Sequence, residues 1–173
     1  QVVGYQGTDY SKPGKVIACA KHWVGYGAAE GGRDYNTTDL TERALRELYF
    51  PPFKAAVDAG VGSFMSAFND LDGTPASANP FTLTRVLRGE WKFDGLVVSD
   101  YTSVLELLKH GIAADEPEAA ARALTAGVDM EMVSRLYNRH LPDLLQRNAV
   151  PASVVGGGVR VNTPVGLIRL DFG

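Results

Sequence analysis

Short runs of apolar residues recur along this chain, and segments with the apolar spacing of helices lie between them. Four apolar runs stand out, at residues 15–23, 60–68, 95–100 and 128–132. Helical patterns follow them at residues 39–60, 81–91, 102–111, 115–127 and 134–148. Apolar runs of this length that alternate with helices are typical of a parallel sheet with helices packed against it. The pattern therefore predicts an α/β fold of parallel βα repeats, joined by right-handed crossovers.

The first predicted helix has recognisable start and stop signals. Thr38 or Asp39 can cap its amino end, because their side-chain oxygens accept hydrogen bonds from first-turn amides. Pro51 and Pro52 lack the amide hydrogen of a helix interior, so we expect a kink or an interruption there. Gly60 is suited to the left-handed conformation that ends many helices.

The chain divides into one large unit and a short tail. Residues 1–150 hold about four βα units. Residues 151–173 form a glycine-rich tail, in which Gly156, Gly157 and Gly158 would each cost a helix about 1 kcal/mol relative to alanine. We expect this tail to be irregular, with room for a short strand over residues 165–170.

Polar and aromatic residues stand at the carboxyl ends of the predicted strands. The loops that follow parallel strands converge on one edge of the sheet, which is where such folds place their functional groups. The strand-end residues are Lys21 and His22, Phe68 and Asn69, Asp100 and Tyr101, and Glu131. The sequence therefore predicts a site at this edge.

Asp100 has two interpretations. An aspartate that follows a strand and precedes a helical pattern can be a helix cap. The same carboxylate, next to the aromatic Tyr101, can act as a nucleophile or a general base on a bound substrate.

Lys21 and His22 are also open to more than one interpretation. A lysine at the end of a buried strand needs an acceptor, because an uncompensated buried ammonium is costly. Asp100 or the hydroxyls of a ligand could serve, and a Schiff base on Lys21 with a carbonyl substrate is a further alternative. Taken alone, His22 is better explained as a hydrogen-bonded core histidine. Side by side at a strand end, Lys21 and His22 instead favour ligand binding.

The long polar loop at residues 25–39 follows this pair. It lacks the glycine spacing that phosphate-binding loops require. We therefore interpret it as a wall of the site, with Arg33 or Asp34 available to hold neighbouring loops.

Composition and charge narrow the classes of partner. The 173 residues are 45% hydrophobic and 21% charged, as in soluble globular proteins. The net charge of −3 gives no electrostatic reason to expect nucleic acid or an anionic membrane, and no apolar run approaches the ~20 residues of a membrane span. Cys19 is the only cysteine, which excludes an intrachain disulfide, and we expect neither a metal nor a cofactor. The first residues lack the charged and then apolar layout of a signal peptide, and the sequence does not indicate a cellular compartment.

Three ordered segments carry a family resemblance. GKVIACAKHWVGYGAAEGGRDYN, MSAFNDLDGTPAS and WKFDGLVVSDY resemble the catalytic barrel of glycoside hydrolase family 3, which contains β-glucosidases and exo-β-glucosidases. The resemblance extends from about Lys15 to about Leu145. It implies about half of a TIM-type (β/α)8 barrel, corresponding to the second half of the family's barrel.

The resemblance also implies roles for individual residues. Asp100 would be the catalytic nucleophile of a retaining enzyme that cleaves terminal β-glucosides or short β-glucans. Lys21 and His22 would bind glucose hydroxyls. The same sugar pocket would be lined by Met65 and Phe68, together with Tyr101.

Two departures from the family limit what we expect of the chain alone. The first half of the barrel and the following domain, which supplies the family's general acid, have no counterpart here. We therefore expect weak activity or none in isolation, and the alternative is a non-catalytic half-barrel that binds sugar weakly. Half a barrel leaves two exposed sheet edges, so we expect a homodimer formed through them.

Overall fold

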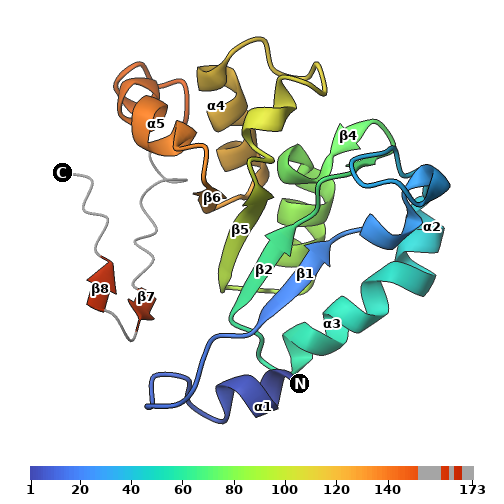
Figure 1. Cartoon of the computed structure of the whole chain (residues 1–173), viewed down its shortest axis with the longest axis vertical. Helices are drawn as coiled ribbons and strands as arrows, with labels where there is room; N and C mark the ends of the chain where they lie inside the picture. Colours follow the sequence, from blue (N-terminus) through green and yellow to red (C-terminus); the bar gives the residue numbers. More distant parts are fainter. Residues whose placement is uncertain (152–160, 164–165, 169–173) are drawn as a thin grey trace.

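The computed structural model describes residues 1–151, 161–163 and 166–168, and its centre is a four-stranded parallel sheet (Figure 1). The strands lie side by side in the order β1 (Cys19–Trp23), β2 (Ser63–Ser66), β5 (Leu96–Tyr101) and β6 (Met130–Met132). Each strand begins inside one of the predicted apolar runs. The predicted α/β fold of parallel βα repeats is therefore confirmed.

Helices and short hairpins connect these strands. The helices are α1 (Val2–Gln6), α2 (Glu42–Ala44), α3 (Phe50–Asp58), a π-helical segment (Phe81–Glu90), α4 (Glu116–Ala126) and α5 (Leu136–Gln146). A small hairpin pairs β3 (Asp70–Leu71) with β4 (Thr74–Pro75), and a second pairs β7 (Val161–Thr163) with β8 (Gly166–Ile168). The strand predicted over residues 165–170 coincides in part with β8, while Gly156 to Gly158 lie outside the described residues.

The first predicted helix begins later than expected. Thr41 is the cap, and its hydroxyl oxygen accepts a hydrogen bond from the Ala44 amide at 3.2 Å. Neither Thr38 nor Asp39 caps it, so that prediction is wrong. Thr38 is instead fully buried, in a β-bridge with Leu71.

Pro51 and Pro52 do not break this helix. A π-helical turn over residues 45–49 joins α2 to α3, and the prolines lie in the first turn of α3. The π-helical turn interrupts the regular α-helical hydrogen bonding directly before the prolines, so the predicted interruption is present although the chain stays helical. The helix ends at Ala59 and Gly60, as predicted, and Gly60 has φ +76°.

The prediction of a helix over residues 102–111 is wrong. Only a single 3₁₀ turn forms there, at Leu105–Leu107. Thr102 takes a left-handed conformation, with φ +55°, which interrupts any helix starting at the end of β5. The Ser103 amide donates to the Asp100 carbonyl at 3.2 Å, forming a tight turn.

The two faces of the sheet differ in burial. Phe64 and Val97 are register partners on one face, and both are fully buried. On the other face, Met65 of β2 pairs with Val98 of β5, and Val98 pairs with Met130 of β6. Met65 and Val98 are half-buried, and Met130 is 51% exposed. The sheet thus has one well-packed face and one partly open face.

The packed face rests on an aromatic cluster around Trp23, which is fully buried. Its ring centroid lies 5.0–5.7 Å from those of four neighbours, which are Phe50, Phe53, Phe64 and Trp91. These residues come from α3, β2 and the end of the π-helical segment. The cluster therefore joins the helical layer to the first two strands.

No helix in the described residues is both long and apolar enough to cross a bilayer.

Strands β2 and β5 begin at a close backbone approach. The Leu96 amide donates to the Gly62 carbonyl at 3.1 Å. A Cβ atom on Gly95 would lie 2.4 Å from that same oxygen and 2.6 Å from the Phe93 ring. Only a residue without a side chain fits at position 95 without moving backbone.

We expect Gly95→Ala to lower the free energy of unfolding by about 1–3 kcal/mol, because overpacking against backbone forces the strand apart. Urea denaturation followed by circular dichroism measures this. Gly27→Ala is the matched control, since a Cβ there meets nothing within 4 Å. Equal unfolding free energies for the two variants would contradict the close-approach argument.

Candidate active site

Asp100 lies one residue before the end of β5, at the edge where the carboxyl ends of the strands gather (Figure 1). It is only 8% exposed. Its Oδ1 atom accepts a hydrogen bond from the Tyr101 amide at 2.7 Å. Its Oδ2 atom is buried and has no hydrogen-bond partner among the described residues. The side chain caps no helix, so the capping interpretation is wrong.

His22 reaches Asp100 across the intervening strand. Its Nε2 atom lies 3.4 Å from Asp100 Oδ2, although β2 separates their strands. The imidazole is half-buried, and its ring centroid lies 4.7 Å from that of Tyr26. The structure therefore brings together two of the predicted site residues.

The charge state of His22 follows from its surroundings. Burial lowers the pKa of His22 below its ordinary value of about 6.5, and the Lys21 ammonium lowers it further. The Asp100 and Asp34 carboxylates act in the opposite direction without overcoming burial. The imidazole is therefore neutral at neutral pH, and its contact with Asp100 is between a polar ring and a carboxylate rather than between two full charges.

Lys21 differs from the prediction. Its side chain is exposed, and it makes no ion pair with Asp100 in the described part of the chain. The prediction that Lys21 is buried at a strand end is wrong. Because β1 is an outer strand of the four-stranded sheet, water reaches the ammonium group. Lys21 remains next to His22, and its charge contributes to the pKa of that ring.

The other predicted pocket residues lie in or just after the two inner strands β2 and β5. Phe68 follows β2 and packs against Tyr35, with ring centroids 4.3 Å apart. Tyr101 ends β5 and is 55% exposed. Met65 lies on the partly open face of β2, opposite Val98.

Two other strand-end residues have structural partners. Asn69 is fully buried, and its amide donates to the carbonyls of Val24 at 3.3 Å and Asp70 at 3.0 Å. The Glu131 carboxylate accepts a hydrogen bond from the Ser134 hydroxyl. Neither side chain is hydrogen-bonded to Asp100 in the described part of the chain.

The polar loop at residues 25–39 lies against this edge. The Tyr26 hydroxyl donates to Asp34 at 2.6 Å, so Asp34 holds the loop to the residue that contacts His22. The Thr37 hydroxyl donates to Asp70 at 3.0 Å and connects the loop to the β3–β4 hairpin. These bonds fix both ends of the loop beside the carboxyl ends of β1 and β2.

Sequence reasoning missed a chain of buried serine hydroxyls below the site. Ser66 and Ser77 are 2.8 Å apart, and Ser77 and Ser103 are 2.7 Å apart. Ser103 also donates its amide to Asp100, so the chain supports the turn that follows the carboxylate. The three serines are far apart in sequence, and no local pattern indicates that they meet.

Glu106 is a second carboxylate that sequence reasoning did not select. Its Oε1 atom accepts a hydrogen bond from the Thr102 hydroxyl at 3.2 Å. Its Oε2 atom is buried without a hydrogen-bond partner in the described residues.

In the described part of the chain, no three His, Cys, Asp or Glu side chains come together as a metal site.

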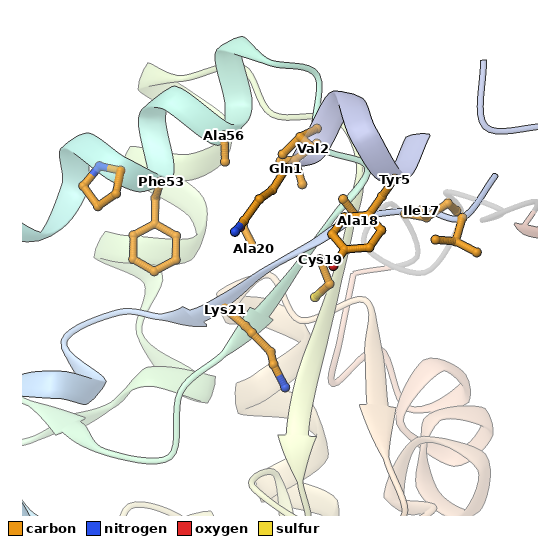
Figure 2. Close-up of a pocket in the computed structure, with 13 residues that line it drawn as sticks. Gln1, Val2, Tyr5, Ile17, Ala18, Cys19, Ala20, Lys21, Phe53 and Ala56 are labelled. Atoms are coloured by element: carbon orange, nitrogen blue, oxygen red, sulfur yellow. The ribbon is translucent and has the colours of Figure 1, made fainter. Parts of the chain in front are cut away.

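A cleft of about 600 Å³ lies elsewhere, along the outer edge of β1. Figure 2 shows its lining from α1, from residues 17–21 and from α3. Lys21 is the one predicted site residue that borders it. The cleft therefore belongs to the sheet edge rather than to the surroundings of Asp100.

Known proteins resemble the chain in sequence and in fold. Residues 1–160 match the family described as Glycosyl hydrolase family 3 N terminal domain. A periplasmic beta-glucosidase of Salmonella typhimurium is 43% identical over 159 residues, which are 92% of this chain and 21% of that protein. A beta-xylosidase of Formosa agariphila is 46% identical over 136 residues, which are 76% of this chain and 19% of that protein.

The crystal structure of a beta-glucosidase from Listeria innocua in complex with glucose has a TM-score of 0.86 and 39% identity to this chain, covering 89% of this chain and 22% of that one. The chain thus spans about a fifth of the length of these relatives. The resemblance noted in the sequence is confirmed, because both the family match and the fold extend over most of the chain: this protein belongs to glycosyl hydrolase family 3.

Proposed function

We propose that this chain carries the nucleophile of a retaining β-glucosidase, and that the nucleophile is Asp100. The observation that carries the proposal is the buried Oδ2 atom of Asp100, which has no hydrogen-bond partner among the described residues. A buried carboxylate oxygen without a partner is costly. That cost is explained if a substrate atom completes the site.

The chemistry needs a carboxylate that can reach an anomeric carbon. Asp100 attacks that carbon, the bond to the leaving oxygen breaks, and a glycosyl ester of Asp100 forms. Water then hydrolyses the ester and restores the carboxylate. In retaining glycosidases a second carboxyl group, about 5–5.5 Å from the first, protonates the leaving group and activates the water.

The neighbouring side chains bind the sugar. A neutral His22 donates or accepts hydrogen bonds with sugar hydroxyls while it faces Asp100. Lys21, at the same strand end, supplies an ammonium donor. Met65, Phe68 and Tyr101 provide apolar and aromatic surface for the faces of the sugar ring.

The substrate class is a terminal β-glucoside or a short β-glucan, and the family resemblance implies that the general acid belongs to a different domain. For that reason we expect slow turnover by the chain alone, restricted to substrates whose leaving groups need no protonation. The alternative is a non-catalytic half-barrel that binds sugar weakly. Such a half-barrel would assemble with itself, and the open edges of β1 and β6 in the described sheet favour that alternative.

A fluorinated inactivator separates the two functions. With 2,4-dinitrophenyl 2-deoxy-2-fluoro-β-glucoside, we expect covalent labelling of the peptide that contains Asp100, detected by mass spectrometry. The leaving group departs unprotonated, so the test does not need the general acid. Asp100→Asn abolishes the label, whereas Asp94→Asn, which removes an exposed carboxylate before β5, keeps it. An unlabelled wild-type chain would favour the non-catalytic alternative.

The neutral state of His22 is measurable on the chain alone. We expect its NMR titration midpoint to lie below about 6.5, since burial disfavours the imidazolium. Asp100→Asn lowers the midpoint further, because it removes a carboxylate that raises the pKa, and Lys21→Met raises the midpoint. The lowered pKa also means that the stability contributed by neutral His22 is present above pH 6.5 and is lost as pH falls through the folded-state pKa. A midpoint above 6.5 would contradict the neutral role.

The sheet edges predict self-association. In the described sheet, β1 and β6 each pair on one side only, so two copies can join β6 of one to β1 of the other and close eight parallel strands around a twofold axis. Multi-angle light scattering from nanomolar to micromolar concentration is expected to show a rise from monomer to dimer mass. Monomer at every concentration would rule the homodimer out.

A further inference from the structure

Tyr35, in the loop at residues 25–39, has an exposed aromatic ring that the proposed function leaves unused. Tyr35 is 46% exposed and has φ +67°. Gly31 and Gly32 take nearly the same φ, at +66° and +64°, in the same loop. A side chain in this conformation costs about 1–2 kcal/mol, which glycine avoids. Position 35 thus carries a tyrosine where glycine would be unstrained, and an observed strain of this kind is a reason to seek a function for the side chain.

The ring of Tyr35 has a fixed support. It packs on Phe68 with the ring planes tilted by 40° and the centroids 4.3 Å apart. Hydrogen bonds hold the loop on both sides of it, since Asp34 accepts from Tyr26 and the Asn36 side chain donates to the Glu30 carbonyl at 2.9 Å. The ring is therefore a positioned surface and not the tip of a loose loop.

A line of contacts leads from the Asp100 carboxylate to the loop that holds Tyr35. His22 Nε2 lies 3.4 Å from Asp100 Oδ2, and the His22 and Tyr26 ring centroids are 4.7 Å apart. The Tyr26 hydroxyl then donates at 2.6 Å to Asp34, the residue before Tyr35. Apart from the effect of burial, the charges of Glu106, Asp100 and Asp34 raise the pKa of Tyr35, and Tyr101 acts in the same direction. The loop therefore brings the exposed ring of Tyr35 to the same end of the sheet as Asp100, where the exposed Tyr101 ends β5.

Depth distinguishes the tyrosine from the sugar-binding pair. Asp100 is buried and His22 half-buried, so the ring whose anomeric carbon is attacked lies deep. The group attached to that carbon extends outward, where Tyr35 is half exposed. An aromatic ring supplies a large apolar surface at low cost in side-chain entropy, which suits the face of a second sugar or an aryl group.

We propose that Tyr35, supported by Phe68, is the platform for the leaving-group side of the substrate, where it contacts the second sugar or the aryl ring. This inference rests on the proposed function, since it presupposes a sugar at Asp100. It makes Tyr35 a determinant of specificity for what is attached to the glucose.

Two stable glucosides test the platform. The dissociation constants of methyl β-glucoside and phenyl 1-thio-β-glucoside are measured by NMR titration of the whole chain. Tyr35→Ala is expected to reduce the preference for the phenyl compound by about three- to tenfold, the size of one aromatic contact, with the affinity for methyl β-glucoside unchanged within error. Tyr35→Phe keeps the preference. Tyr10→Ala, which removes a ring that is 47% exposed before β1, also keeps it.

The outcomes separate this inference from the function on which it rests. If neither glucoside binds the wild-type chain, the sugar site and the platform both fail. If methyl β-glucoside binds and Tyr35→Ala leaves the phenyl preference intact, the platform is overturned and the sugar site stands. Tyr35→Gly guards against misfolding, because it removes the ring and suits the backbone. It is expected to lose the phenyl preference with no lower free energy of unfolding, and a retained preference in that variant would also overturn the platform.

Discussion

The position of Asp100 depends on the register between β2 and β5. Ser63, Phe64 and Met65 pair in parallel with Leu96, Val97 and Val98, so the end of β5 lies beside the end of β2. The pairing begins where the backbone at Gly95 approaches the Gly62 carbonyl. Because side chains alternate between the two faces of a strand, a slip of one residue would exchange the faces of Val97 and Val98 and turn Asp100 away from His22. The geometry of the site therefore rests on a contact at the opposite end of the same strands.

The alternation of apolar runs and helices was sufficient to predict the sheet, because burial of parallel strands leaves a direct signature in the sequence. Asp100 was identifiable for the same reason, as an acidic residue at the end of a buried run. The environment of Lys21 was not, because burial at a strand end depends on whether the strand lies inside the sheet or at its edge. Sequence order does not state that directly.

Local competition explains the other differences. Thr38, Asp39 and Thr41 are all acceptable caps, and the choice fell to Thr41 because Thr38 pairs with the hairpin residue Leu71. The left-handed backbone at Thr102 ended a helix that side-chain spacing alone favoured. Tyr35 and the serine chain depend on contacts between segments far apart in sequence, which no pattern within one segment reports.

The partly open face of the sheet affects the stability of the fold. All rings of the aromatic cluster around Trp23 come from this chain, so the packing of the helical layer does not depend on what contacts the other face of the sheet. Met65, Val98 and Met130, in contrast, keep apolar surface in contact with water. Anything that binds this surface only in the folded state increases stability by mass action. The resistance of the fold to denaturation is thus not a fixed property of the polypeptide, but grows as the partly open face becomes occupied.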